Sequence, residues 1–103
     1  MQNKILSYLG LSMKAGKAVS GEFSVEQSVK TGKAEIVIVA EDASKNTKKL
    51  FSDKCAYYNV PEYVYGTKEQ LGRAIGKEMR ASVAVIDAGL ANKIEQELKT
   101  MNE

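Results

Sequence analysis

The stretch Glu35-Ile36-Val37-Ile38-Val39-Ala40 decides the fold class, because four consecutive β-branched residues lie at its centre. Runs of this kind are typical of strands that are buried on both faces of a sheet. A second run, Ser82-Val83-Ala84-Val85-Ile86-Asp87, has the same character. We predict that the two runs are the central strands of one sheet and lie side by side or nearly so.

Helical spacing and capping residues around these strands predict five helices. They cover residues near 3–14, from 20 or 21 to about 31, from 42 or 44 to about 59, after the capping pair Thr67 and Gln70, and from about 90 to 100. Two further short strands are predicted at 17–19 and 63–65. Helices that alternate with strands indicate an α/β fold. We expect a three-layer α/β/α sandwich, one domain over residues 1–103, with a central mixed sheet of about four strands.

Composition excludes several classes of protein. The chain has 103 residues and no apolar run near the roughly 20 residues that span a bilayer. Its first residues lack the basic and then apolar layout of a secretion signal. Cys55 is the only cysteine, so neither an internal disulfide nor a disulfide-linked partner is expected, and a reducing cytoplasm is the expected location. The chain has no histidine, which removes the commonest catalytic base and the commonest zinc ligand.

The net charge of +2 hides an uneven distribution. Residues 1–33 carry +3, residues 43–54 carry +3 and residues 68–80 carry +2, whereas residues 34–42 carry −3 and residues 81–103 carry −2. The positive segments would form a polyanion-binding face if the fold brought them together, with helix N-termini adding backbone donors for phosphate. A merely solvated surface is the alternative, because lysines cover the outside of most soluble domains.

Other residues are assigned structural roles. Asp42 is expected to cap a helix, and Cys55 is expected to be a small buried apolar residue. Gly72 and Gly76 are expected to let a helix pack closely against the sheet. Four tyrosines have the chemistry to stack on bases, but packing in the core and at edges is favoured for them. They are Tyr57, Tyr58, Tyr63 and Tyr65.

Several blocks together resemble the L-seven-Ae ribosomal protein family, and more narrowly its bacterial YlxQ-like branch. The resemblance covers about residues 3–99. The blocks that carry it include Lys17-Ala18-Val19-Ser20-Gly21-Glu22, Ala40-Glu41-Asp42-Ala43-Ser44, Asn46-Thr47, Gly72-Arg73, Ile75-Gly76-Lys77-Glu78, Ala81-Ser82-Val83-Ala84-Val85 and Ala91-Asn92-Lys93.

The resemblance implies an α/β/α sandwich that binds kink-turn RNA through two segments. One is the start of the second helix, where the family has the pattern Gly-x-Asn-Glu-x-x-Lys. Gly21 matches the glycine and Glu22 takes the variable position. The other three positions depart from the pattern, with Phe23 for Asn, Ser24 for Glu and Gln27 for Lys. The second segment, the loop before the last strand, keeps the family's character.

These matches define a candidate RNA-binding set. Lys17, Lys30, Lys33, Lys77 and Arg80 are expected to contact phosphate. Ser24 and Gln27 are expected to face base edges, and Met79-Arg80-Ala81-Ser82 to cradle extruded bases. Two roles stay open for Phe23, which either stacks on a base or packs the second helix onto its neighbours.

Two functions from different classes follow. The first is a non-catalytic, ribosome-associated protein that binds structured, kink-turn-like RNA, with RNA and ribosomal proteins as its partners. The alternative is a protein-interaction adaptor that keeps the fold but has lost specific kink-turn recognition. No enzymatic activity, cofactor or metal is expected, since the sequence offers neither a nucleophile setting nor a cluster of metal ligands.

Overall fold

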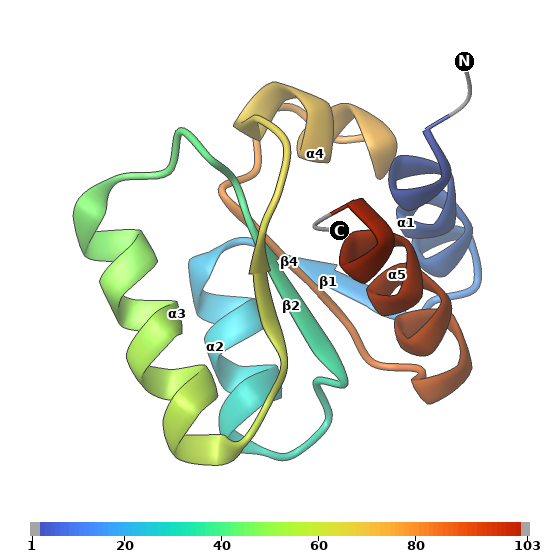
Figure 1. The fold of residues 1–103 in the computed structure, drawn as a ribbon. Coiled ribbons are helices and arrows are strands. Elements are labelled where there is room, and N and C mark those ends of the chain that lie inside the picture. Colours follow the sequence, from blue (N-terminus) through green and yellow to red (C-terminus); the bar gives the residue numbers. More distant parts are fainter. Residues whose placement is uncertain (1–2, 102–103) are drawn as a thin grey trace.

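The computed structural model describes residues 3–101, in which five helices alternate with four strands (Figure 1). The ends of the predicted domain, residues 1–2 and 102–103, lie outside the described residues. The elements are α1 (Lys4–Lys14), β1 (Ala18–Ser20), α2 (Glu22–Lys30), β2 (Ile36–Val39), α3 (Lys45–Tyr58), β3 (Glu62–Val64), α4 (Lys68–Ala74), β4 (Ser82–Val85) and α5 (Ala88–Met101).

The four strands form one mixed sheet in the order β1-β4-β2-β3. β4 runs antiparallel to both β1 and β2, and β3 runs parallel to β2. Opposite pairs in the centre are Ile36 with Val85 and Val39 with Ser82. The prediction that the two apolar runs lie side by side at the centre of a four-stranded mixed sheet is therefore confirmed.

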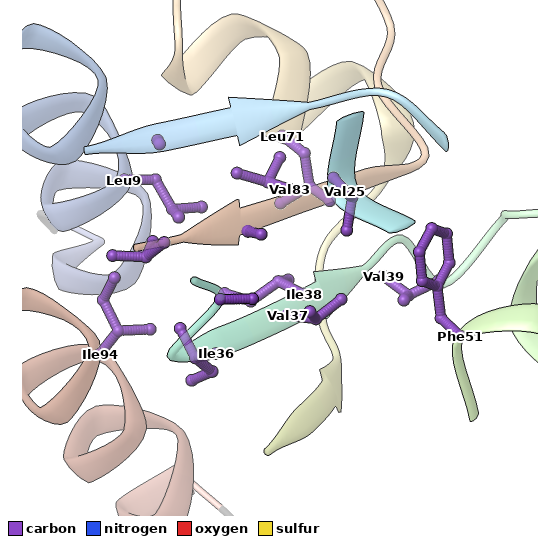
Figure 2. Packing of buried hydrophobic residues seen from close by; sticks show 14 of the residues in the cluster. Leu9, Val25, Ile36, Val37, Ile38, Val39, Phe51, Leu71, Val83 and Ile94 are labelled. Atoms are coloured by element: carbon purple, nitrogen blue, oxygen red, sulfur yellow. The ribbon is translucent and has the colours of Figure 1, made fainter. Parts of the chain in front are cut away.

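Helices cover both faces of the sheet (Figure 1). α2 and α3 pack together on one face, and α1, α4 and α5 lie on the other. Figure 2 shows Phe51 of α3 beside Val39, and Ile94 of α5 beside Ile36. Since successive side chains of a strand point to opposite faces, β2 must be apolar at every position to serve both layers. All four of its residues are buried.

Several element boundaries differ from the predicted ones. β1 and β3 each lie one residue from their predicted positions, β1 later and β3 earlier. α5 begins two residues earlier than expected, because the Asp87 carboxylate accepts a hydrogen bond of 2.9 Å from the Leu90 amide and caps the helix. The capping box of α4, formed by Thr67 and Gln70, is confirmed.

Asp42 caps a different helix from the one expected. The N-cap of α3 is Ser44, whose side chain accepts from the Thr47 amide. Asp42 instead accepts a 2.8 Å hydrogen bond from the amide of Lys68, the first residue of α4. The parallel pairing of β2 and β3 brings the two loops together, a contact across 26 residues that local sequence does not reveal.

Within residues 3–101, no helix combines the length and the apolar character that crossing a bilayer requires.

Candidate functional site

One end of the sheet gathers most of the predicted site. Here β1, β2 and β3 end and β4 begins. The register shows this, because Ser20 lies opposite Val83, and Val39 lies between Ser82 and Val64. Helices α2, α3 and α4 therefore all start at this end. We call this surface the rim and define it as residues 20–24, 41–48, 66–68 and 76–82.

Backbone hydrogen bonds tie the rim segments together. The amide of Gly21 donates to the Ser82 carbonyl at 3.1 Å, and the Glu41 amide donates to the Gly66 carbonyl at 2.7 Å. The Arg80 amide donates to the Lys68 carbonyl at 3.0 Å. The segments are therefore held in fixed relative positions by the sheet and not by mobile side chains.

Arg80 joins the loop before β4 to the end of β1. Its Nε donates to the Ser20 hydroxyl at 3.2 Å, and its Nη1 donates to the Met79 carbonyl at 2.9 Å. A guanidinium carries five N–H donors, so these two bonds leave others for a ligand. Among residues 3–101, no carboxylate forms an ion pair with Arg80.

The N-terminus of α2 faces this site without a side-chain cap. Its N-cap, Gly21, has φ of 90° and ψ of 152°, a conformation that residues with a Cβ rarely adopt. By contrast, side chains cap α1, α3 and α4. The first amides of a helix lack partners within the helix, and together with its dipole they attract anionic groups. The start of α2 therefore offers backbone donors as well as side chains.

Two large apolar side chains at the rim lie in solvent. Phe23 is 76% exposed and Met79 is 56% exposed. This exposure removes one of the two roles that were left open for Phe23, because a residue that packed α2 onto its neighbours would be buried. The other exposed members of the predicted set at the rim are Glu22, Ser24 and Lys77. Gln27 is also exposed, but it lies further along α2, beyond the rim.

Gly72 determines where the loop before β4 lies. A Cβ built on Gly72 would meet the Glu78 carbonyl oxygen at 1.4 Å, so the loop backbone rests directly on α4. The Lys77 amide also donates to the Gly72 carbonyl at 2.8 Å. The expectation that Gly72 packs a helix against the sheet was wrong, because its close neighbour is this loop. Gly76 has φ of 73° and makes the turn that ends α4.

The structure does not bring all predicted site residues together. Lys17, Lys30 and Lys33 lie at the opposite end of the sheet, where the Lys17 carbonyl accepts from Ile86 and the Lys33 amide donates to Ser28. Ser82 is at the rim, but its side chain is fully buried and cannot touch a ligand at the surface. Its carbonyl positions Gly21 instead.

The carboxylate of Glu22 reduces the positive charge of the rim. Glu22 accepts a 3.3 Å hydrogen bond from the Thr47 hydroxyl, which links α2 to α3. Lysines at the starts of α3 and α4 lie at the same end. They are Lys45, Lys48 and Lys68. The second and third positive segments therefore each bring part of their charge to the rim, whereas the first segment contributes no lysine to it.

Sequence reasoning missed Ser20 and Asp42 as residues that position this surface. Ser20 contacts a residue 60 positions away, and Asp42 one that is 26 positions away. No local pattern marks such contacts, although both residues lie where a predicted strand ends.

The four tyrosines divide into two pairs. Tyr63 and Tyr65 are half-buried, as predicted, and the Tyr63 hydroxyl donates to Glu95 at 2.8 Å. Burial and this carboxylate raise the pKa of Tyr63. Tyr57 is 78% exposed and Tyr58 is 38% exposed, so the packing prediction was wrong for this pair.

Cys55 is buried, as predicted. Burial, with a smaller contribution from the charge of Glu62, raises the pKa of its thiol to about 12. The part of the chain that the structure describes contains no group of three or more acidic or cysteine side chains arranged to hold a metal ion.

Comparison with known proteins identifies relatives over most of the chain. Residues 3–95 match the model of the ribosomal protein L7Ae/L30e/S12e/Gadd45 family. RNA-binding protein YlxQ of Bacillus subtilis is 49% identical over 86 residues, which cover 84% of this chain and 86% of that protein. Large ribosomal subunit protein eL30 of Candida albicans is 37% identical over 94 residues, 85% of each chain.

A solved structure agrees with the fold. A protein of unknown function from Bacillus halodurans superposes with a TM-score of 0.89 at 41% identity, covering 92% of this chain and 96% of that one. The two curated relatives carry the names of an RNA-binding protein and of a ribosomal protein, in line with the expectation of a non-catalytic protein. With its fold and nearly its whole length matched, the chain belongs to the ribosomal protein L7Ae/L30e/S12e/Gadd45 family.

Proposed function

We propose that the protein binds structured RNA at the rim, that kink-turn-like RNA is its target, and that it does so in association with the ribosome in the cytoplasm. The observation that carries the proposal is the fixed placement of Arg80 and the uncapped start of α2 side by side, through the Arg80–Ser20 and Gly21–Ser82 hydrogen bonds. The names of the relatives, an RNA-binding protein and a ribosomal protein, support it.

The phosphate backbone is met by charge and by backbone donors. Arg80 and Lys77 contact phosphates from the loop, and the first amides of α2 add neutral donors next to Gly21. Contacts of this kind position a nucleic acid without reading its sequence. Because each neutralised phosphate releases counterions, affinity falls steeply as salt rises.

Base recognition uses a different set of contacts from the family pattern. Ser24 and Gln27 offer hydrogen-bonding groups to base edges, whereas Phe23 replaces the family's asparagine with an exposed ring. Aromatic side chains stack on unpaired bases in RNA complexes. Met79, exposed on the loop, supplies a second apolar surface for an extruded base.

The test is a titration of a labelled kink-turn RNA and of a plain duplex of equal length, followed by fluorescence anisotropy at about 50 and 200 mM salt. The kink-turn is expected to bind far more tightly than the duplex. Arg80→Ala is expected to weaken kink-turn binding by about tenfold or more, because a hydrogen bond to a charged group contributes about 1.5–3 kcal/mol.

The matched control is Lys93→Ala, which removes an exposed lysine of α5 outside the rim. This variant should bind as the wild type does. Equal, salt-sensitive binding to both RNAs would leave a general polyanion binder. No binding at low salt would favour the second candidate, a protein-interaction adaptor, for which the exposed Phe23 and Met79 supply an apolar contact surface.

A further inference from the structure

A groove of about 510 Å³ lies on the surface of α3, outside the rim. Its lining residues all belong to this one helix, and they are Leu50, Asp53, Lys54, Tyr57 and Tyr58. The function proposed for the rim leaves this groove unused. Its lining combines one aliphatic side chain, two aromatic rings and one ion of each sign.

Tyr57 presents its ring to solvent in a defined orientation. The side chain is 78% exposed. Its ring centre lies 4.9 Å from that of Tyr58, and the two rings meet edge to face at 77°. Such an arrangement is favourable for aromatic pairs, and it leaves a face of the Tyr57 ring free for a flat ligand.

The charge along α3 favours a polyanion. α3 carries Lys45, Lys48, Lys49 and Lys54 against a single acid, Asp53. Asp53 and Lys54 both line the groove, and the charge of Asp53 is partly offset because it is paired with Lys49 at 3.1 Å. A peptide held by apolar contacts alone would not require this excess of positive charge.

The groove also lies within reach of the rim. α3 starts at the rim, where the Thr47 hydroxyl donates to Glu22, and ends at the opposite end of the sheet. At 1.5 Å per residue, Tyr57 lies about 18 Å along the helix axis from Lys45. A stacked nucleic acid strand rises about 3.4 Å per nucleotide along its axis and covers that distance in about six nucleotides. α2 packs alongside α3 (Figure 1). Lys30 is the last residue of α2, and Lys33 lies in the loop that follows.

We propose that this groove is a second RNA contact, in which an unpaired base of a single strand leaving the rim stacks on Tyr57 while Lys54 holds its phosphate. The proposal rests on the RNA binding proposed for the rim and extends it. Lys30 and Lys33 were predicted to contact phosphate but cannot reach the rim. In this proposal they contact the same RNA strand at the far end of the layer formed by α2 and α3.

The first experiment compares a kink-turn RNA with the same RNA carrying a six-nucleotide single-stranded tail, at its 5′ or its 3′ end. For the wild type, one of the tails is expected to raise affinity by about fivefold or more, since stacking of one base contributes about 1 kcal/mol or more. Tyr57→Ala should lose this gain and bind the tailless RNA as the wild type does. Tyr57→Phe keeps the ring and should keep the gain.

Two charge variants and one control sharpen the result. Lys54→Ala should reduce the gain from the tail, and Asp53→Asn should increase it, because removal of the acid makes the groove more positive. Leu11→Ala removes an exposed apolar side chain from α1 on the opposite face and should change nothing. A gain that persists in full in Tyr57→Ala would overturn the proposal.

A second measurement separates the groove from the rim. The chain contains no tryptophan, so Tyr57→Trp introduces a single tryptophan into the groove, and its fluorescence can be excited separately from that of the tyrosines. A single-stranded hexanucleotide alone is expected to quench its fluorescence, in Arg80→Ala as well as in the otherwise unchanged chain. Quenching without kink-turn binding would contradict the rim function and keep the groove. Kink-turn binding without quenching would contradict the groove and keep the rim.

Discussion

Single residues at the rim act mainly on the backbone around them. Gly21 adopts a positive φ, and its amide donates a hydrogen bond to the Ser82 carbonyl. The Ser20 hydroxyl accepts a hydrogen bond from the Nε of Arg80. Neither residue needs to touch a ligand to matter, because each determines where a donor points. Phe23 and Met79, which are proposed to contact RNA directly, instead have side chains that lie in solvent.

Glu62 on β3 illustrates a residue whose environment opposes its charge. Burial raises the pKa of its carboxyl above the usual value of 4.5. An acid whose pKa is raised on folding holds its proton more tightly in the folded state than in the unfolded state. The stability that this tighter proton binding contributes is therefore fully present below about pH 4.5, and it is lost as the pH rises through the folded-state pKa.

We expect Glu62→Gln to be more stable than the wild type at pH 7, and the difference to vanish at pH 4 and below. The gain should be less than about 1 kcal/mol, because the side chain remains partly in contact with solvent. Urea unfolding followed by circular dichroism across this pH range measures the effect.

Glu35→Gln, at an exposed position before β2, is the control and should stay within about 0.5 kcal/mol of the wild type throughout. A Glu62→Gln variant that loses stability at pH 7 would show that the carboxylate is stabilised and not strained by its surroundings.

At the scale of elements, α4 and the loop after it form one unit. The loop backbone lies against Gly72, the Lys77 amide donates to the carbonyl of the same glycine, and the Arg80 amide donates to the carbonyl of Lys68 at the start of the helix. Asp42 and the Thr67 capping box hold that start in turn. The position of Arg80 therefore depends on the whole helix and not on the loop alone.

Gly72→Ala tests this dependence. Its Cβ cannot fit 1.4 Å from the Glu78 carbonyl oxygen, so the loop must move. We expect a loss of about 1–3 kcal/mol in stability, the usual cost of overpacking. We also expect a clear loss of kink-turn affinity at temperatures where the variant remains folded, measured by anisotropy beside a thermal unfolding curve.

Gly89→Ala is the matched change in α5, where the nearest atom is a side-chain oxygen of Asp87 at an ordinary 3.4 Å. It should fold and bind RNA as the wild type does. If Gly72→Ala loses stability yet binds RNA with unchanged affinity, the loop is not part of the binding surface.

At the scale of the whole molecule, the sheet serves as a rigid plate between two helical layers. Its central strands, β2 and β4, are buried at every position, so neither layer can detach without exposing apolar surface. Because the rim is made from the ends of all four strands, its geometry should persist until the domain unfolds as a unit.

Cys55 is a probe of that unit. The residue is 2% exposed, and the raised pKa of its thiol, about 12, keeps it protonated at neutral pH. Modification by a disulfide reagent requires an accessible thiolate, so the native protein should react at least about 1,000-fold more slowly than the unfolded chain, in line with a stability of several kcal/mol.

The reaction rate, measured at pH 8 in rising urea, should increase in step with the loss of circular dichroism. The fully denatured chain is the reference for complete reactivity. Rapid labelling of the native protein would mean that α3 opens on its own, and the groove on that helix would then need to be reconsidered.

The sequence by itself determined the layered α/β architecture, the five helices and the burial of the two central strands. These features follow from short-range periodicity, since apolar runs such as 36–39 and capping pairs such as Thr67 with Gln70 act within a few residues of each other. The family blocks also located both segments of the candidate site, at Gly21 and at Arg80, although they are 59 positions apart.

Only the tertiary structure decided which residues meet. The antiparallel placement of β4 between β1 and β2 brings Arg80 to Ser20 and leaves Lys17, Lys30 and Lys33 at the far end. The direction of a strand decides which end of the sheet its loop reaches, and local sequence does not encode that direction. Tertiary packing also decides exposure, because other elements cover Ser82 and leave Phe23 and Tyr57 in solvent.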